Sequence, residues 1–307
     1  MKAMRDGYGE MLVEMGKKNG NVVVLVGDLT ESTRTDLFRE EFPERFFEMG
    51  ISEQNMMGVA AGMAASGKIP LVNSFACFNP GRNWEQMKIS VCLSKTNVKV
   101  VGGHAGFGNG GDGGNQQSFE DIALVRVLPN MTVVVPADYE QIKKAVMEIT
   151  EFTGPVYMRM TKPNRPVITT KATPFKIGKA QVMRAGKDVS VFACGAMVYE
   201  ALLAASELAN EIDVEVVNVH TIKPLDRETL VASAKKTRKV VTAEEHQIAG
   251  GLGGAVAELL SVEMPVPMMM VGMSDKFGES GDPAELLVKH GMNKETIISK
   301  IRGLYGK

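Results

Sequence analysis

The chain has 307 residues, 44% of them hydrophobic, which is enough for two ordinary globular domains with buried cores. A formal net charge of -1, with lysines and arginines spread along the chain, argues against a nucleic-acid partner. The sequence shows neither a signal-peptide pattern nor a long apolar segment, so we expect a cytoplasmic protein without membrane contact. Cys77, Cys92 and Cys194 are far apart and lack metal-ligand spacing, so we interpret them as core residues and expect no metal site in this chain.

Short apolar, β-branched runs alternate with amphipathic stretches through the first half of the chain. The runs that predict strands are 22–26, 70–75, 98–101, 132–135 and 156–160, and the stretches that predict helices are 54–65, 84–93, 118–127 and 139–150. Strands that are apolar on both faces are typical of a parallel sheet covered by helices. The pattern therefore predicts a doubly wound α/β domain over residues 1–165.

A polar, proline-containing stretch at 162–179 predicts a linker. Beyond it, apolar runs at 189–193, 214–219, 239–242 and 267–271 alternate with helical patterns at 198–208, 227–234, 253–260 and 283–290. We predict a second and smaller domain over residues 180–307, again doubly wound with a mostly parallel sheet. Both halves thus belong to the α/β class.

Several segments carry polar or aromatic residues at the carboxyl end of a predicted strand, where ligands of open α/β sheets bind, or, for Glu53, at the start of a predicted helix. These candidates are, in chain order, Asp28, Ser32, Glu53, Phe75, Phe78, His104 and Asp112. Each also has an ordinary structural interpretation: helix capping for the first three, core packing for the aromatics and a hydrogen-bonded structural role for the histidine. Residue chemistry alone leaves both interpretations open.

The stretch 102–114 contains a G-x-G-x-x-G pattern at Gly106, Gly108 and Gly111. In a dinucleotide-binding fold these glycines form the turn directly between strand and helix, and an acidic residue follows about 20 residues later. Here His104 precedes the pattern and more glycines follow it, so we do not predict nicotinamide binding. A loop this rich in glycine can bring its backbone close to a ligand.

In their order and spacing, these segments resemble the pyrimidine-binding and C-terminal domains of transketolase, over nearly the whole chain. The segments that carry the resemblance are VGDLTEST, FFEMGISEQNMMGVAAGMA, NSFACFNPGRNWEQMK, GGHAGFGNGGDGGNQQSFEDIALVRVLPNM and GPVYMRMTKP. The N-terminal transketolase domain, which in the family binds the diphosphate of thiamine diphosphate through Mg²⁺, has no counterpart here. The resemblance is therefore to the smaller, C-terminal subunit of a split transketolase, and it implies a thiamine diphosphate shared with a partner subunit that binds the Mg²⁺.

The resemblance implies a role for each cofactor-side candidate. Glu53 matches the glutamate that hydrogen-bonds the pyrimidine ring of thiamine diphosphate. This carboxyl has to donate a proton, so we expect it to be buried. Phe78 matches the aromatic residue that stacks on the pyrimidine, with Phe75 beside it, and Asp28 matches a residue at the cofactor and subunit interface.

On the substrate side, the resemblance implies contacts from Ser32, His104 and Asp112, with His104 also a catalytic candidate. Two positions depart from the family pattern: Gln116 stands where a histidine contacts the donor sugar, and Lys162 stands where an arginine usually binds phosphate. Glutamine does not titrate near neutrality, and lysine offers a point charge in place of a bidentate fork. A variant ketose substrate is therefore an alternative to the usual one.

The implied activity is transfer of a two-carbon ketol unit between sugar phosphates, in a symmetric assembly of this chain with an N-terminal transketolase subunit. Three alternatives remain open at this point: the β subunit of a 2-oxo acid dehydrogenase, a non-catalytic subunit, and a flavodoxin-like binding module. In the C-terminal half, the segment 244–254 predicts a strand exit and a helix N-terminus that either binds an anion or is architectural.

Overall fold

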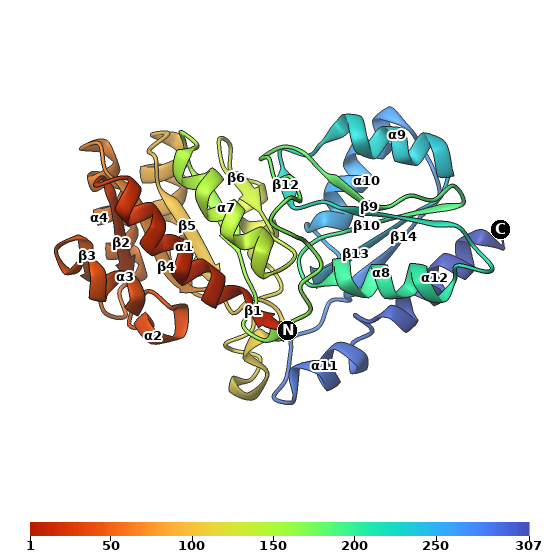
Figure 1. The fold of residues 1–307 in the computed structure, drawn as a ribbon, viewed down its shortest axis with the longest axis horizontal. Coiled ribbons are helices and arrows are strands. Elements are labelled where there is room, and N and C mark those ends of the chain that lie inside the picture. Colours follow the sequence, from red (N-terminus) through yellow and green to blue (C-terminus); the bar gives the residue numbers. More distant parts are fainter. Residues whose placement is uncertain (307) are drawn as a thin grey trace.

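The computed structural model describes residues 1–306 as two lobes, each built on one mostly parallel sheet (Figure 1). The first sheet has seven strands in the order β12-β6-β7-β5-β4-β2-β3, and the second has five in the order β14-β13-β10-β11-β9. All neighbours pair in parallel except β12 with β6 and β11 with β9. This confirms the predicted α/β class with two mostly parallel sheets.

Helices cover both faces of the first sheet. Its strands are β2 (Val22–Val26), β3 (Phe46–Glu48), β4 (Ile69–Phe75), β5 (Lys99–Gly103), β6 (Thr132–Val134), β7 (Val156–Arg159) and β12 (Thr221–Lys223). The helical segments of this half are α1 (Met4–Lys18), α2 (Thr30–Thr33), α3 (Asp36–Glu41), η1 (Pro43–Arg45), α4 (Glu53–Ala65), α5 (Trp84–Gln86), η2 (Met87–Leu93), η3 (Phe107–Asp112), α6 (Asp121–Arg126) and α7 (Tyr139–Glu151). Successive residues of β2 join separate apolar clusters on opposite faces, which is why a continuous apolar run predicted this strand.

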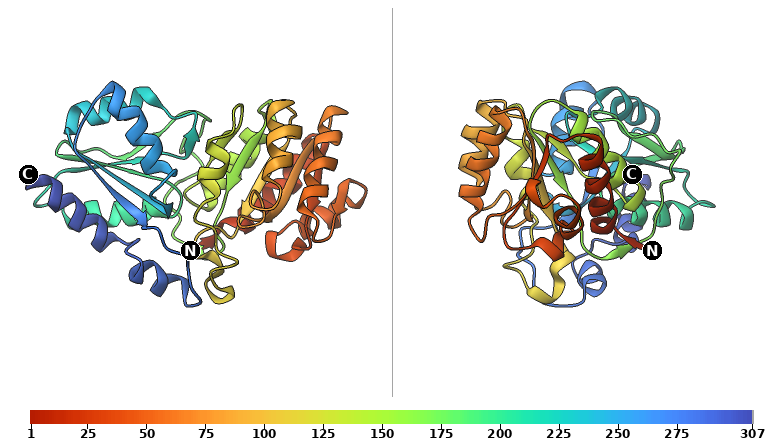
Figure 2. Two further views of the ribbon diagram at one scale, coloured as in Figure 1. Left: turned by 180° about the vertical axis from the view of Figure 1, so that it is seen from behind. Right: turned by 60° about the vertical axis from the view of Figure 1, so that its left-hand side comes forward.

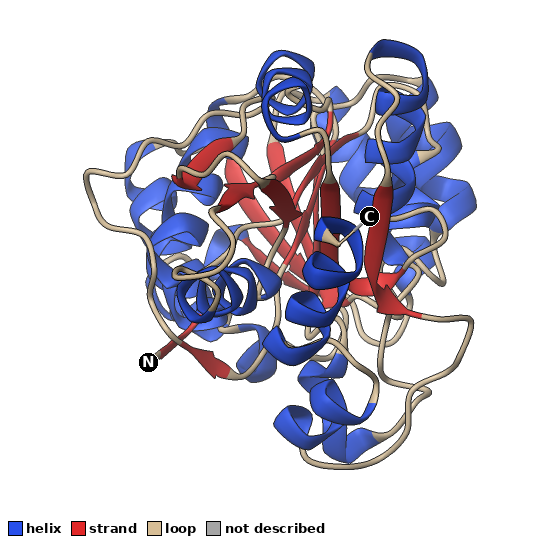
Figure 3. Cartoon of the chain, turned by 90° about the vertical axis from the view of Figure 1, so that its right-hand side faces the viewer, coloured by secondary structure: helices blue, strands red, loops and turns tan. Residues whose placement is uncertain are grey.

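The second lobe repeats the layered arrangement, with its strands fanned out between helices in Figures 2 and 3. Its strands are β9 (Gln181–Arg184), β10 (Val189–Ala193), β11 (Val214–Asn218), β13 (Val240–Gln247) and β14 (Met268–Met273). Its helices are α8 (Met197–Glu207), α9 (Arg227–Thr237), α10 (Leu252–Glu263), α11 (Pro283–Lys289) and α12 (Lys294–Tyr305). A small antiparallel pair, β1 (Lys2–Ala3) with β8 (Asn164–Arg165), fastens the N-terminus near the boundary of the lobes.

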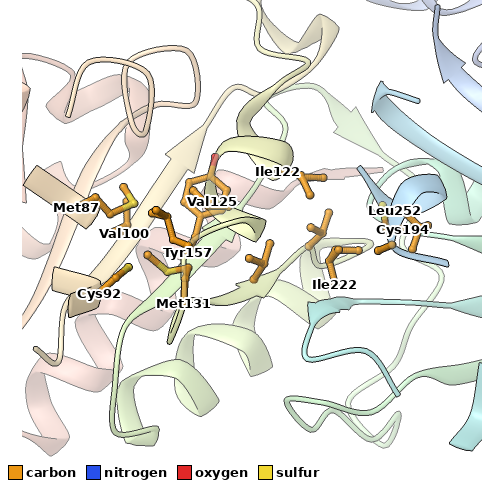
Figure 4. Close-up of a cluster of buried hydrophobic side chains, with 14 of the residues drawn as sticks. Met87, Cys92, Val100, Ile122, Val125, Met131, Tyr157, Cys194, Ile222 and Leu252 are labelled. Atoms are coloured by element: carbon orange, nitrogen blue, oxygen red, sulfur yellow. The ribbon is translucent and has the colours of Figure 1, made fainter. Parts of the chain in front are cut away.

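The two lobes share both a sheet and a core. Strand β12, which comes after the linker in the sequence, is an edge strand of the first sheet. One buried apolar cluster also runs from Met87 and Tyr157 in the first lobe to Cys194 and Leu252 in the second, with Ile222 of β12 between them (Figure 4). The sequence pattern did not predict that β12 would join the sheet of the first lobe.

Two long helices, α1 and α12, also lie outside the predicted set. The glycines of α1 interrupt its apolar periodicity, yet they serve close packing: a Cβ on Gly7 would lie 2.9 Å from the carbonyl oxygen of Tyr139 at the start of α7. Over residues 1–306, no helix combines the length and apolarity needed to cross a bilayer. Cys92 and Cys194 are buried free thiols, and Cys77 is partly exposed.

Candidate functional site

A cavity of about 290 Å³ lies at the carboxyl edge of the first sheet and collects all four predicted cofactor residues. Phe75 ends β4 and Phe78 follows in the next turn, so their rings lie nearly parallel, with centroids 6.2 Å apart and an interplanar angle of 16°. Glu53 is the first residue of α4, and only 4% of it is exposed. The cavity therefore pairs a flat aromatic surface with a buried carboxyl group.

The other two predicted residues of this cavity come from loops. Asp28 follows β2, and Gln116 comes from the glycine-rich loop, so four separate segments converge here. Asp28 has a φ of 58°, in the left-handed region that non-glycine residues rarely adopt. Such backbone strain persists only where surrounding contacts hold it, and it is common at functional sites.

Glu48, which sequence reasoning missed, supplies the contacts that hold Asp28. One carboxylate oxygen of Glu48 accepts hydrogen bonds from the backbone N–H of Asp28 at 2.7 Å and of Gly50 at 3.1 Å. The other oxygen accepts one from the Thr30 hydroxyl at 2.7 Å. Glu48 thus ties the loop of Asp28 to the loop that leads into Glu53.

Arg82 is a second residue of the cavity that the sequence did not single out. Its guanidinium lies 3.6 Å from a carboxylate oxygen of Glu53, and its Cζ lies 4.4 Å from the centroid of the Phe78 ring. The side chain is 51% exposed. It therefore contacts the two residues with the clearest implied roles while remaining open to solvent.

A second cavity of about 530 Å³ collects positive charge and holds two of the predicted substrate residues, Lys162 and Asp112. Arg5 of α1 and Arg34 after α2 line it as well, and neither carries a local sequence signal for a site. Arg5 also donates to the backbone carbonyl of Ser32 at 3.2 Å, which places that predicted residue next to the cavity wall. The carboxylates of Asp6 and Asp112 line the cavity too, and Arg34 pairs with Asp6 at 2.7 Å, so the cations exceed the carboxylates by one. This excess suits an anionic group.

His104 lines neither cavity, but it packs against Phe75 in the wall of the first one. Its ring centroid is 4.1 Å from that of Phe75, and its φ of 57° is the second strained backbone among the predicted residues. It is 1% exposed, and neither ring nitrogen has a hydrogen-bond partner within residues 1–306. Burial, assisted by the charges of Lys162 and Arg5, lowers the pKa of His104 from 6.5 to about 3. The imidazole is therefore neutral at physiological pH, with two unpaired polar atoms next to the aromatic pair.

The lowered pKa of His104 predicts an acid-sensitive contribution to stability. The unfolded chain takes up this proton near pH 6.5 and the folded chain only near pH 3, so the contribution is complete above pH 6.5 and is lost as the pH falls. Between pH 7 and pH 5 we expect His104 to account for about 2 kcal/mol of lost unfolding free energy. Denaturant unfolding at both pH values should show this loss in the wild type and a smaller one in His104→Gln. Equal losses of unfolding free energy in the two proteins would show that His104 is not the source of the pH dependence.

The predicted helix N-terminus in the second lobe is architectural. Both carboxylate oxygens of Glu244 accept backbone hydrogen bonds from the first turn of α10, from Leu252 at 2.7 Å and Gly253 at 2.8 Å. Burial raises the pKa of Glu244 to about 7. Because this carboxyl group already occupies the place where an external anion would bind, the anion-binding alternative is wrong.

The residues present fit half of a site for a heteroaromatic cofactor. A flat pyrimidine would find the Phe75 and Phe78 rings for stacking and the buried Glu53 carboxyl for a hydrogen bond. The unpaired nitrogens of His104 mark a neighbouring position for a polar group. Residues 1–306 contain no cluster of three or more histidine, cysteine, aspartate or glutamate side chains able to hold a metal ion.

Comparison with known proteins identifies the class. Residues 1–167 match the model of the transketolase pyrimidine-binding domain, and residues 178–297 match that of the transketolase C-terminal domain. These domains are those of thiamine diphosphate enzymes. The chain belongs to the transketolase family and corresponds to its C-terminal section, as the resemblance predicted.

Individual relatives agree with this assignment. A putative transketolase C-terminal section of Methanocaldococcus jannaschii is 45% identical over 98% of this chain and 95% of its own length. A 6-deoxy-6-sulfo-D-fructose transketolase subunit of a Clostridium species is 42% identical over 96% of this chain and 92% of its own length. A solved structure described as a split gene transketolase, inactive β4 tetramer, superposes with a TM-score of 0.93 at 46% identity, covering 100% of this chain and 99% of the other. Human transketolase is 34% identical, and the match covers 99% of this chain and 49% of the human protein.

Proposed function

We propose that the chain is the C-terminal subunit of a thiamine diphosphate-dependent transketolase that transfers a two-carbon ketol unit from a ketose phosphate to an aldose phosphate. The observation that carries the proposal is the buried Glu53 carboxyl beside the parallel rings of Phe75 and Phe78 in one cavity. When bound, thiamine diphosphate supplies a carbon nucleophile and stabilises the negative charge that develops on the transferred fragment.

The residues of this chain would hold and orient the reactants. Glu53 would donate a hydrogen bond to the pyrimidine and Phe78 would stack on it, while Asp28 would lie at the junction with the partner. His104, neutral and with both ring nitrogens free within residues 1–306, would donate to or accept from sugar hydroxyls and move a proton at either nitrogen. Asp112 and Gln116 would contact further hydroxyls.

The rest of the cofactor site would come from an N-terminal subunit that binds the diphosphate through Mg²⁺. The active unit would then be a symmetric assembly, most simply two copies of each subunit, in the cytoplasm. The test is ketol transfer from xylulose 5-phosphate to ribose 5-phosphate, with thiamine diphosphate and Mg²⁺, using this chain alone and together with its partner. Activity only in the pair is the expected result. Activity with a 2-oxo acid and an artificial electron acceptor instead would favour the dehydrogenase alternative.

The positively charged cavity would bind the phosphate of the sugar, with Arg5, Arg34 and Lys162 as donors. We expect Lys162→Ala to raise KM for a ketose phosphate by about 10- to 100-fold, since a hydrogen bond to a charged group is lost. KM for unphosphorylated xylulose should change little. Lys187→Ala, which removes an exposed lysine of the second lobe, serves as the control. An equal rise in KM for the phosphorylated and the unphosphorylated ketose in Lys162→Ala would contradict a phosphate contact.

A variant ketose is the second candidate, because Gln116 lines the cofactor cavity in place of the usual histidine. Relatives named for 6-deoxy-6-sulfo-D-fructose and for apulose 4-phosphate are 42% and 35% identical to this chain. Both compounds end in an anion, which the same three cations would accept. If the pair binds thiamine diphosphate but does not use xylulose 5-phosphate, these ketoses are the donors to try next.

A further inference from the structure

The loop from Gly102 to Ser118 carries three of the proposed substrate contacts, His104, Asp112 and Gln116, and it packs against the C-terminal half of the chain. Figures 1 and 2 show its tip, which includes η3, beside the segment that leads into α11. No role in the proposed chemistry falls to the C-terminal lobe, so these contacts require an explanation of their own.

The first contact comes from Glu245 on β13. Its Oε1 accepts a hydrogen bond of 2.8 Å from the backbone N–H of Phe107, and the residue is 3% exposed. Gly106, two residues after His104, has a φ of 64°, and a Cβ there would lie 2.4 Å from the Glu245 carboxyl carbon. Glu245 is itself held from the first lobe, because Arg159 donates to its backbone carbonyl at 2.7 Å.

The second contact is with the backbone of the segment 278–281. The N–H of Gly281 donates to the carbonyl of Gly110 at 2.9 Å, and the Gln117 side chain donates to the carbonyl of Glu279 at 2.9 Å. A Cβ on Gly110 would lie 2.4 Å from the carbonyl oxygen of Gly281, and one on Gly114 would lie 2.6 Å from that of Gly278. Only glycine permits this approach, so the glycines at 110 and 114 serve contact with the protein's own backbone.

The segment 278–281 is in turn fixed to the end of α11. The Glu279 carboxylate pairs with Lys289 at 2.7 Å and with His290 at 3.0 Å. The ring centroid of His290 lies 5.1 Å from that of Phe107, so the end of α11 contacts the loop as well. The loop is therefore held at Phe107, Gly110 and Gln117 by groups that all belong to the C-terminal lobe.

We propose that Glu245 and the segment 278–281 are positioning residues, through which the C-terminal lobe sets the geometry of the substrate loop. This inference rests on the proposed function only in assuming that His104, Asp112 and Gln116 of the loop contact the substrate. Glu245 binds the loop near its start, so a shift of the backbone at this contact would also displace His104. The cofactor residues Glu53 and Phe78 lie on other segments, whereas Gln116 of the loop lines the cofactor cavity and His104 packs against Phe75. Substrate contacts should therefore respond more than cofactor binding.

Glu245→Ala, which removes the acceptor, and Glu245→Gln, which keeps an oxygen, form the matched pair. In the chain alone, hydrogen exchange of amides in 104–117 should be about tenfold faster in Glu245→Ala and near wild type in Glu245→Gln. Exchange in β10 reports whether the second lobe remains folded. Gly110→Ala, whose Cβ would lie 2.4 Å from the carbonyl oxygen of Gly281 and so crowd the other contact, should also speed exchange in the loop.

In the assembled pair, Glu245→Ala should raise KM for the ketose phosphate about 10- to 100-fold, change the Kd of thiamine diphosphate by a smaller factor, and be rescued by Glu245→Gln. Unchanged loop exchange in Glu245→Ala, or a faster loop with an unchanged KM, would overturn the proposal. A wild-type pair without ketol transfer would instead refute the proposed function, and the exchange measurement would still decide whether Glu245 holds the loop.

Discussion

Replacing Glu53 by glutamine is expected to lower kcat for ketol transfer in the assembled pair by about 10²- to 10⁴-fold, the range for loss of a positioned proton donor. Glutamine keeps the shape of the buried side chain but cannot exchange a proton with the pyrimidine. Glu53 is 4% exposed and one of its carboxyl oxygens lies 3.6 Å from Arg82, so glutamine also changes the group that faces this guanidinium. Initial rates and the Kd of thiamine diphosphate should be measured together.

Glu228→Gln is the control for this experiment, because its side chain is 88% exposed on the second lobe. It should leave both kcat and cofactor binding unchanged. A Glu53→Gln pair with wild-type kcat would show that the carboxyl does not participate. Loss of cofactor binding without change in kcat at saturation would assign Glu53 a binding role only.

Replacing Arg159 by leucine is expected to cost about 3–5 kcal/mol of unfolding free energy, the usual result of removing one partner of a buried ion pair. Arg159 donates to Asp121 at 2.8 Å, and Asp121 is fully buried. The variant would leave that carboxylate with the Tyr157 hydroxyl at 2.8 Å and the Ser118 hydroxyl at 3.3 Å as its side-chain donors. Denaturant unfolding of the chain alone measures the difference.

The matched control is Arg302→Leu, which breaks an exposed pair with Glu211 in which the side chains are 53% and 56% exposed. Exposed pairs contribute little, so we expect a loss below about 1 kcal/mol. Equal losses in the two variants would mean that the buried pair contributes no more than a surface one.

Much of the fold follows from local pattern, and the misses have physical causes. The apolar run of β2 predicted a strand buried on both faces, because both faces are covered by helices. Strand β12 has three residues and pairs with β6 across a long stretch of chain, so its position depends on tertiary contacts rather than on its own composition. The helix predicted at 84–93 exists, but from Met87 it is a π-helix, which periodicity does not distinguish.

The candidate site was predictable where a residue follows a strand directly. Asp28 and Phe78 stand in such places, Glu53 begins a helix that the pattern also predicted, and the structure brings all three to one cavity. Arg5 was not predicted, because a lone arginine near the N-terminus has no local signal, and only the packing of α1 brings it to the cavity of Lys162. The roles of all these residues stay predictions until the variants are measured.

The apolar cluster that spans the two lobes has a consequence for how this chain can be divided. Cutting after residue 165 would strip β12 from β6 and leave an open edge strand beside exposed apolar side chains such as Met131 and Leu128. Unpaired edges of this kind promote association between chains. The two lobes can be told apart in the sequence, but each depends on the other for a complete fold. A chimaera that joins the first lobe to another C-terminal lobe would therefore have to keep β12.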